Sequence, residues 1–135
     1  MKSVRHYFAL LLLLPFLVLA ACNNKSEENP RQLIAGESSK VWKADKETNA
    51  QGDKERLSNT EEEQRMEFYA NGTFQVREAG AFQGGRWNYN ATQKELELTF
   101  DDRQDVKEVF HVQELSGNKM TLHAADGSTM KLKTD

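Results

Sequence analysis

The sequence predicts an all-β domain built as an eight-stranded antiparallel meander that closes into an up-and-down barrel. Apolar and polar residues alternate in short runs along most of residues 63–135, which is typical of strands with one buried face. Asn71-Gly72, Gly117-Asn118 and Asp126-Gly127 are turn dipeptides that separate such runs. The third observation is that the apolar residues of neighbouring runs meet on one face when the runs are paired as hairpins.

The predicted strands are short and follow one another closely. They cover residues 40–47, 64–70, 73–79, 85–90, 94–100, 105–115, 119–125 and 128–134. The stretch Gly80–Gly85, which contains Phe82, is interpreted as a connection because three of its residues are glycines. No other connection is long except residues 49–61, so each strand is expected to pair with the next along the chain.

Pairing arithmetic tests this arrangement, because opposed residues of antiparallel strands lie on the same face. Three-residue loops at the three turn dipeptides, and a four-residue loop at residues 91–94, bring apolar residues opposite one another. The predicted pairs are Met66 with Val76, Phe68 with Phe74, Trp87 and Tyr89 with Leu98 and Leu96, Val112 with Leu122, and Leu122 with Met130. A meander with one continuous apolar face loses its edges by closing. A two-sheet sandwich is the alternative, and it would need longer crossovers.

The chain begins with a pattern typical of a secretory signal peptide over residues 1–21. Lys2 and Arg5 precede an apolar run of fourteen residues, 8–21, which includes Pro15. A membrane-spanning helix needs roughly 20 apolar residues, so a cleaved signal is favoured.

Leu19-Ala20-Ala21-Cys22 resembles the lipobox of bacterial lipoproteins. The resemblance implies that Cys22, the only cysteine, becomes the mature N-terminus and is alkylated by a diacylglycerol carrying palmitate-type chains. Stable anchoring takes more than one acyl chain. The alternative is an ordinary secreted protein with one free thiol. Residues 22–32 are expected to form a flexible tether, because they are polar and aperiodic.

These features predict a lipid-anchored protein of the bacterial cell envelope, with a folded domain over residues 33–135. The outer membrane is favoured because Asn23 replaces the aspartate that retains lipoproteins at the inner membrane in enterobacteria; the leaflet stays open. The chain has 18 Lys and Arg against 21 Asp and Glu, and removing residues 1–21 makes it more acidic. The sequence has no cluster of Lys and Arg residues of the kind that binds phosphates, which argues against nucleic acid as a partner.

Three stretches then carry a family resemblance. Val41-Trp42-Lys43, the run from Met66 through Asn71-Gly72 to Phe74, and Gly85-Arg86-Trp87-Asn88-Tyr89 resemble the lipocalin-like domain of many Bacteroidota lipoproteins, over about residues 33–135. The resemblance implies the barrel fold. Lys40 stands where lipocalins carry a glycine before the first-strand tryptophan, so their retinoid- and haem-type ligands are not carried over.

No catalytic constellation is evident, and we expect no enzyme activity, cofactor or metal. His111 and His123 are predicted to be opposed neighbours that face outward, without a third ligand. The carboxylates of residues 61–63 and Asp101-Asp102 are interpreted as solvated loop residues.

Function then depends on whether the barrel is filled. The predicted inward set is Met66, Phe68, Phe74, Val76, Trp87, Tyr89, Leu96, Leu98, Phe100, Phe110, Val112, Met120, Leu122, Met130 and Leu132. Eight strands leave an interior that side chains can fill or that holds one small ligand.

Two hypotheses follow. In the first, the anchored barrel binds a small hydrophobic or amphipathic molecule at one mouth, where Trp42, Trp87 and Tyr89 stack on it and Phe82 closes over it as a lid. In the second, a solid-cored barrel contacts another envelope component, for which Phe82 would stand outward. The identity of the ligand or protein partner stays open.

Overall fold

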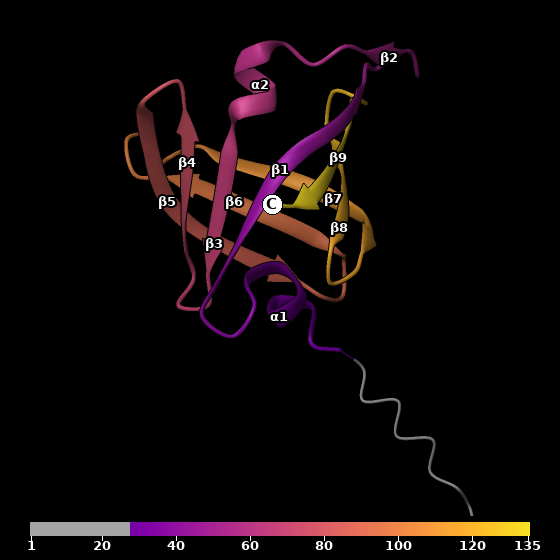
Figure 1. The fold of residues 1–135 in the computed structure, drawn as a ribbon. Helices are drawn as coiled ribbons and strands as arrows, with labels where there is room; N and C mark the ends of the chain where they lie inside the picture. Colours follow the sequence, from indigo (N-terminus) through magenta and orange to yellow (C-terminus); the bar gives the residue numbers. More distant parts are fainter. Residues whose placement is uncertain (1–27) are drawn as a thin grey trace, which may run out of the picture.

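Eight strands form a closed antiparallel barrel in the computed structural model, which describes residues 28–135 (Figure 1). The strands are β1 (Ser39–Thr48), β3 (Arg65–Tyr69), β4 (Thr73–Glu78), β5 (Ala81–Asn90), β6 (Glu95–Phe100), β7 (Lys107–Leu115), β8 (Lys119–Ala124) and β9 (Thr129–Thr134). Each pairs with its neighbour in this order, and β1 also pairs with β9, which closes the sheet. A two-residue strand, β2 (Lys54–Glu55), extends the sheet beside the end of β1. The predicted eight-stranded meander barrel is confirmed, whereas the signal peptide of residues 1–21 and Cys22 lie outside the described residues.

The predicted registers are confirmed for three of the four hairpins, and for the β7–β8 hairpin as far as Val112. Phe68 lies opposite Phe74, Trp87 opposite Leu98, and Leu122 opposite Met130, as pairing arithmetic requires. Every residue of the predicted inward set is buried or packs against the core. The alternation of the sequence therefore specifies both the partners of each strand and the face it buries.

The connection predicted at Gly80–Gly85 is wrong, because β5 begins at Ala81. The turn consists of Ala79 and Gly80 alone, whose φ angles are +48° and +81°, as in the two-residue turns that suit twisted hairpins. Phe82 pairs with Arg77 inside the ladder, and 69% of its surface is exposed. Its side chain stands on the outer face, so it forms no lid.

Two β-bulges break the strict alternation. One lies in β1 between Ala44 and Lys46, and the other in β7 between Val112 and Glu114. Each inserts one residue, so the positions beyond it change face. In β7 the bulge corrects the predicted register near the turn: Leu115 lies opposite Met120 and packs against the core.

Two short helices were not predicted. α1 (Pro30–Ala35) starts where the tether was expected, with Asn29 as N-cap and Pro30 in the first turn. Residues 30–32 are thus helical, and the tether prediction is wrong for them. α2 (Asn59–Glu63) begins with a capping box between Ser58 and Glu61, so the carboxylates interpreted as a solvated loop lie on an exposed helical turn. Neither helix, within residues 28–135, is long and apolar enough to cross a membrane.

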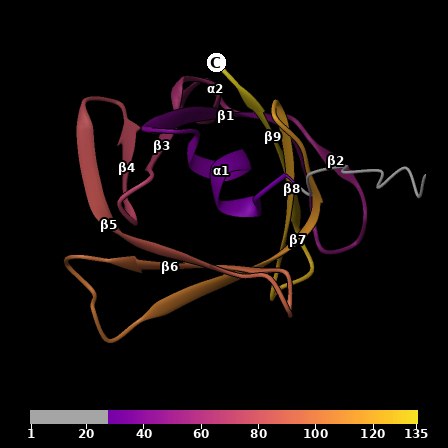
Figure 2. The ribbon, with the colours of Figure 1, turned by 90° about the horizontal axis from the view of Figure 1, so that it is seen from below.

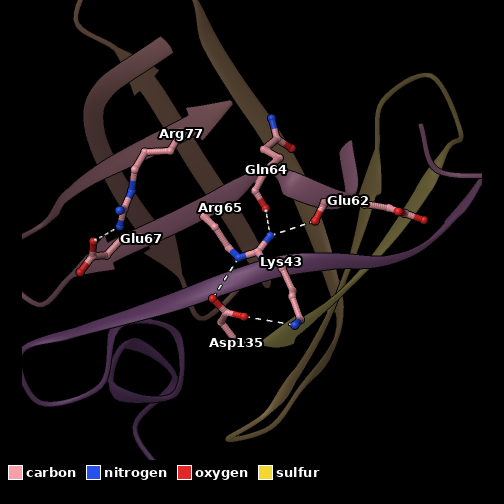
Figure 3. Close-up of polar contacts among 7 residues, drawn as sticks. All are labelled: Lys43, Glu62, Gln64, Arg65, Glu67, Arg77 and Asp135. Atoms are coloured by element: carbon pink, nitrogen blue, oxygen red, sulfur yellow. Dashed lines mark hydrogen bonds and ion pairs between the residues drawn. The ribbon is translucent and has the colours of Figure 1, made fainter. Parts of the chain in front are cut away.

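Ion pairs on the outer face join the strands where the barrel closes (Figure 3). The Asp135 carboxylate accepts hydrogen bonds from Lys43 Nζ at 3.1 Å and Arg65 Nε at 3.0 Å, which links the end of β9 to β1 and β3. These bonds lower the pKa of Asp135 below its usual range. A further ion pair, between Arg77 and Glu67 at 3.1 Å, links β4 to β3.

Candidate functional site

The two ends of the barrel differ, because α1 fills one of them. Figure 2 shows α1 inside the ring of strands, where Ile34 and Ala35 are fully buried. Trp42 is fully buried, and its Nε1–H donates to the Ile34 carbonyl at 2.8 Å. Lys40 spans the same end, since Nζ donates to the Leu33 and Gly117 carbonyls at 2.7 and 3.0 Å. Lys40 thus helps to close this end of the barrel.

Trp87 belongs to this closed end too. Its Nε1–H donates to the Tyr69 carbonyl at 2.9 Å, its ring meets Phe68 edge to face at 5.7 Å, and the Arg31 guanidinium lies 4.5 Å from its centroid. These contacts leave the Trp87 side chain almost fully buried, and what remains exposed lies in a second, polar pocket beside Arg31. Tyr89, two residues further along β5, is half-buried against the core opposite Leu96.

A cavity of about 450 Å³ opens at the opposite end, which we call the mouth; α2 and the turn between β4 and β5 lie there (Figure 1). Its walls come from all eight barrel strands and from the segments beside them. The lining residues are Glu47, Gln64, Met66, Val76, Glu78, Ala79, Ala81, Gln83, Leu98, Phe100, Glu108, Phe110, Leu122, Ala124, Ser128 and Met130.

None of the four predicted ligand-binding residues lines this cavity. Trp42 and Trp87 are core residues of the closed end, Tyr89 is half-buried against the core, and Phe82 points outward. The physical reason is that α1 occupies the space beside the tryptophans, which the sequence interpretation had left for a ligand.

The predicted inward set divides between the two ends. Met66, Val76, Leu98, Phe100, Phe110, Leu122 and Met130 line the cavity, and the others fill the closed half. Small side chains lie at the mouth, among them Ala81 and Ala124, so no large side chains at these positions cover the opening. The interior of the barrel is therefore filled by side chains in one half and contains a cavity in the other.

Three glutamates, Glu47, Glu78 and Glu108, also line the cavity, and sequence reasoning missed them. Burial raises the pKa of Glu47, and the nearby carboxylates of Glu61 and Glu55 raise it further. Gln64 Nε2 donates to Glu78 at 3.1 Å. Among the described residues, neither Glu47 nor Glu108 pairs with a Lys or Arg side chain. The mouth is consequently acidic and has carboxylates free for a ligand.

The two histidines lie on the outer face, as predicted. His111 is directly opposite His123 across β7 and β8, and His123 Nδ1 is 3.1 Å from Thr129 Oγ1. Within residues 28–135, no three metal-ligating side chains come together.

No family model and no curated protein matches the sequence. Solved structures match the fold. A lipocalin-like protein from Bacteroides uniformis ATCC 8492 superposes with a TM-score of 0.56 at 15% identity, covering 71% of this chain and 96% of that one. An uncharacterized protein from Bacteroides eggerthii DSM 20697 gives 0.57 at 13% identity, over 71% and 98%. A second Bacteroides uniformis protein, solved by NMR, gives 0.51 at 17% identity, over 78% and 91%. The barrel thus has a lipocalin-like fold, and it shares that fold with Bacteroides proteins.

Proposed function

We propose that this lipocalin-like barrel binds a small hydrophobic or amphipathic molecule in the mouth cavity. The observation that carries the proposal is the cavity itself: its 450 Å³ lies in the range of small-molecule sites, roughly 300–1,000 Å³, and its floor is apolar. It is a binding protein in this proposal, with no reaction assigned to it.

The composition of the wall suits an apolar guest of variable shape. Leu98, Phe100 and Phe110 provide rigid apolar surface, and each ligand methylene removed from water there contributes about 0.8 kcal/mol. Met66 and Met130 have flexible, polarizable side chains that adapt to different shapes. Because the closed half of the barrel is solid, the cavity floor is pre-formed and a guest need not order it.

A substitution that fills the cavity tests this function. Ala124 lines the cavity near its opening, and we expect Ala124→Trp to lower the affinity for a decyl-chain ligand at least about tenfold, a loss of roughly 1.4 kcal/mol. The measurement is isothermal titration calorimetry on the purified protein in detergent-free buffer. Val109→Trp is the matched control, because Val109 is exposed on the adjacent strand β7 and lies outside the cavity.

The two variants separate binding from the solid-cored alternative. If wild type and Val109→Trp bind decyl-chain ligands and Ala124→Trp does not, the cavity is the site. If wild type binds none, the proposal is wrong and an envelope interaction protein becomes the better assignment. Native mass spectrometry of the protein from its producing organism adds an independent reading, since a mass lost on denaturation would reveal a natural ligand.

We also propose that the protein is a lipoprotein of the bacterial envelope, held at the outer membrane through Cys22. The sequence Leu19-Ala20-Ala21-Cys22 supports this proposal. The described chain enters the barrel at α1, the end opposite the mouth (Figure 1).

The anchoring prediction is tested by Cys22→Ser. We expect the variant to leave the membrane fraction or to stay uncleaved, because serine has no sulfur to alkylate. Fractionation of cells, with intact mass as the measure of lipid and cleavage, checks it. A cleaved variant that still sediments with membranes would contradict the lipobox interpretation.

A further inference from the structure

We propose that the cavity selects amphiphiles whose polar head carries a positive charge, such as long-chain primary or quaternary amines. This inference rests on the proposed function and names the chemistry of the ligand. It excludes the anionic fatty acids that would otherwise suit an apolar barrel of this size.

The first observation is a repeated dipeptide at the mouth ends of three strands. Lys46-Glu47, Arg77-Glu78 and Lys107-Glu108 each place a basic residue before an acidic one. Successive side chains of a strand point to opposite faces. The glutamates line the cavity, whereas the basic residues point outside, where Arg77 pairs with Glu67 at 3.1 Å and Lys107 with Glu97 at 3.4 Å.

The register places the acidic side chains on the inner face. Glu108 lies opposite Leu98, and Glu47 opposite Met130, and both partners line the cavity. Opposed residues in a ladder share a face. Acidic residues therefore take inward positions, where the alternation would normally place apolar ones.

A bulge turns Glu47 inward. In β1, Ala44 lies opposite the buried Leu132, and strict alternation from Ala44 would direct Lys46 inward. The extra residue at Asp45 reverses this, so Glu47 faces the cavity and Lys46 lies outside opposite Lys131. Bulges at barrel rims commonly re-aim a side chain in this way. Because of the bulge, the mouth is lined by the carboxylate of Glu47 and not by the ammonium group of Lys46.

The three carboxylates surround the opening rather than clustering on one side. Their strands, β1, β4 and β7, stand two or three positions apart around the barrel. No Lys, Arg or His is among the described residues that line the cavity. A cation at the axis of the mouth would meet attractive charge from three directions, whereas a carboxylate head would meet repulsion from all of them.

Four ligands of equal chain length test the inference: decylamine, decyltrimethylammonium, decanol and decanoate, titrated at pH 7 by calorimetry below their micelle concentrations. We expect the two cations to bind at least about tenfold more tightly than decanoate. The affinity of decanol should lie between that of the cations and that of decanoate. If no ligand binds, the proposed function itself fails. If decanoate binds as tightly as the cations, the cavity is confirmed as a site and the charge selectivity is overturned.

Variants then assign the selectivity to the glutamates. Glu47→Gln should lower the affinity for decylamine about threefold to fivefold, the effect expected from losing one partly exposed ion pair. The affinity for decanol should not change. The double variant Glu47→Gln and Glu108→Gln should lower the affinity for decylamine about tenfold and raise the affinity for decanoate. The matched control is Glu55→Gln, because Glu55 is exposed opposite Glu47 in β2 but does not line the cavity. An equal effect of Glu55→Gln would mean that net charge alone acts, and the assignment to the mouth would be overturned.

Discussion

Gly85→Ala should destabilise the barrel by about 3 kcal/mol, the upper part of the range for overpacking a core. A Cβ atom at Gly85 would clash with the Thr99 carbonyl oxygen and lie 2.8 and 2.9 Å from Cε1 and Cζ of Phe74. The Phe74 ring is buried against Phe68 and Phe100, and the Thr99 carbonyl belongs to the backbone of β6, which is paired on both sides. The clash must therefore be relieved by moving a strand.

Gly85 also positions the cavity floor. It lies opposite Phe74 on one side and Phe100 on the other, and these two rings meet edge to face at 5.2 Å. A glycine between two aromatic residues leaves room for both rings over its bare backbone. Because Phe100 lines the cavity, the substitution should weaken ligand binding as well as folding.

Thermal unfolding followed by circular dichroism measures the effect, with an expected fall in Tm of more than about 10 °C. Gly84→Ala is the matched control, since its Cβ would meet only Asp101 Oδ2 and the Phe74 carbonyl, both at 3.5 Å. That variant should change stability by less than about 0.5 kcal/mol. Equal melting temperatures for the two alanine variants would contradict the close approach at Gly85.

The glycines also illustrate what the sequence can predict. Gly80, Gly84 and Gly85 look like a loop because glycine is permissive, and only the approach of Phe74 and Thr99 shows why one of them belongs inside a strand. Strand pairing could be predicted because opposed positions depend only on loop length and parity. The closed barrel followed from the same arithmetic.

The candidate site could not be predicted in the same way. The volume of a cavity is the interior volume of the barrel minus the volume of the side chains inside it. α1 adds Ile34 and Ala35 to one half of the interior only, so that half is filled and the other is not. The tryptophans therefore became core residues, although their ring size had suggested a ligand. The bulge at Asp45 was equally hidden, because a single inserted residue leaves no mark on composition. The repeated basic-acidic dipeptides were the readable signal, and their meaning depended on knowing which face each strand buries.

Trp42→Phe should lower the free energy of unfolding by about 3 kcal/mol and release α1 from the barrel. The phenyl ring leaves part of the indole volume empty, which carries a cavity cost. It also removes the donor to the Ile34 carbonyl, and a buried carbonyl without a partner costs about 1–3 kcal/mol. A six-residue helix has little stability of its own, so α1 depends on such contacts.

Urea denaturation and hydrogen exchange of residues 30–35 check this prediction, with Phe82→Ala as the control for losing an aromatic ring from an exposed position. We expect faster exchange in α1 for Trp42→Phe and a change below about 0.5 kcal/mol for Phe82→Ala. Decylamine affinity should be unchanged in folded Trp42→Phe, because Trp42 lies outside the cavity. A variant with normal stability and lost binding would instead restore Trp42 as a ligand contact, and would place the site at the end of the barrel that α1 closes.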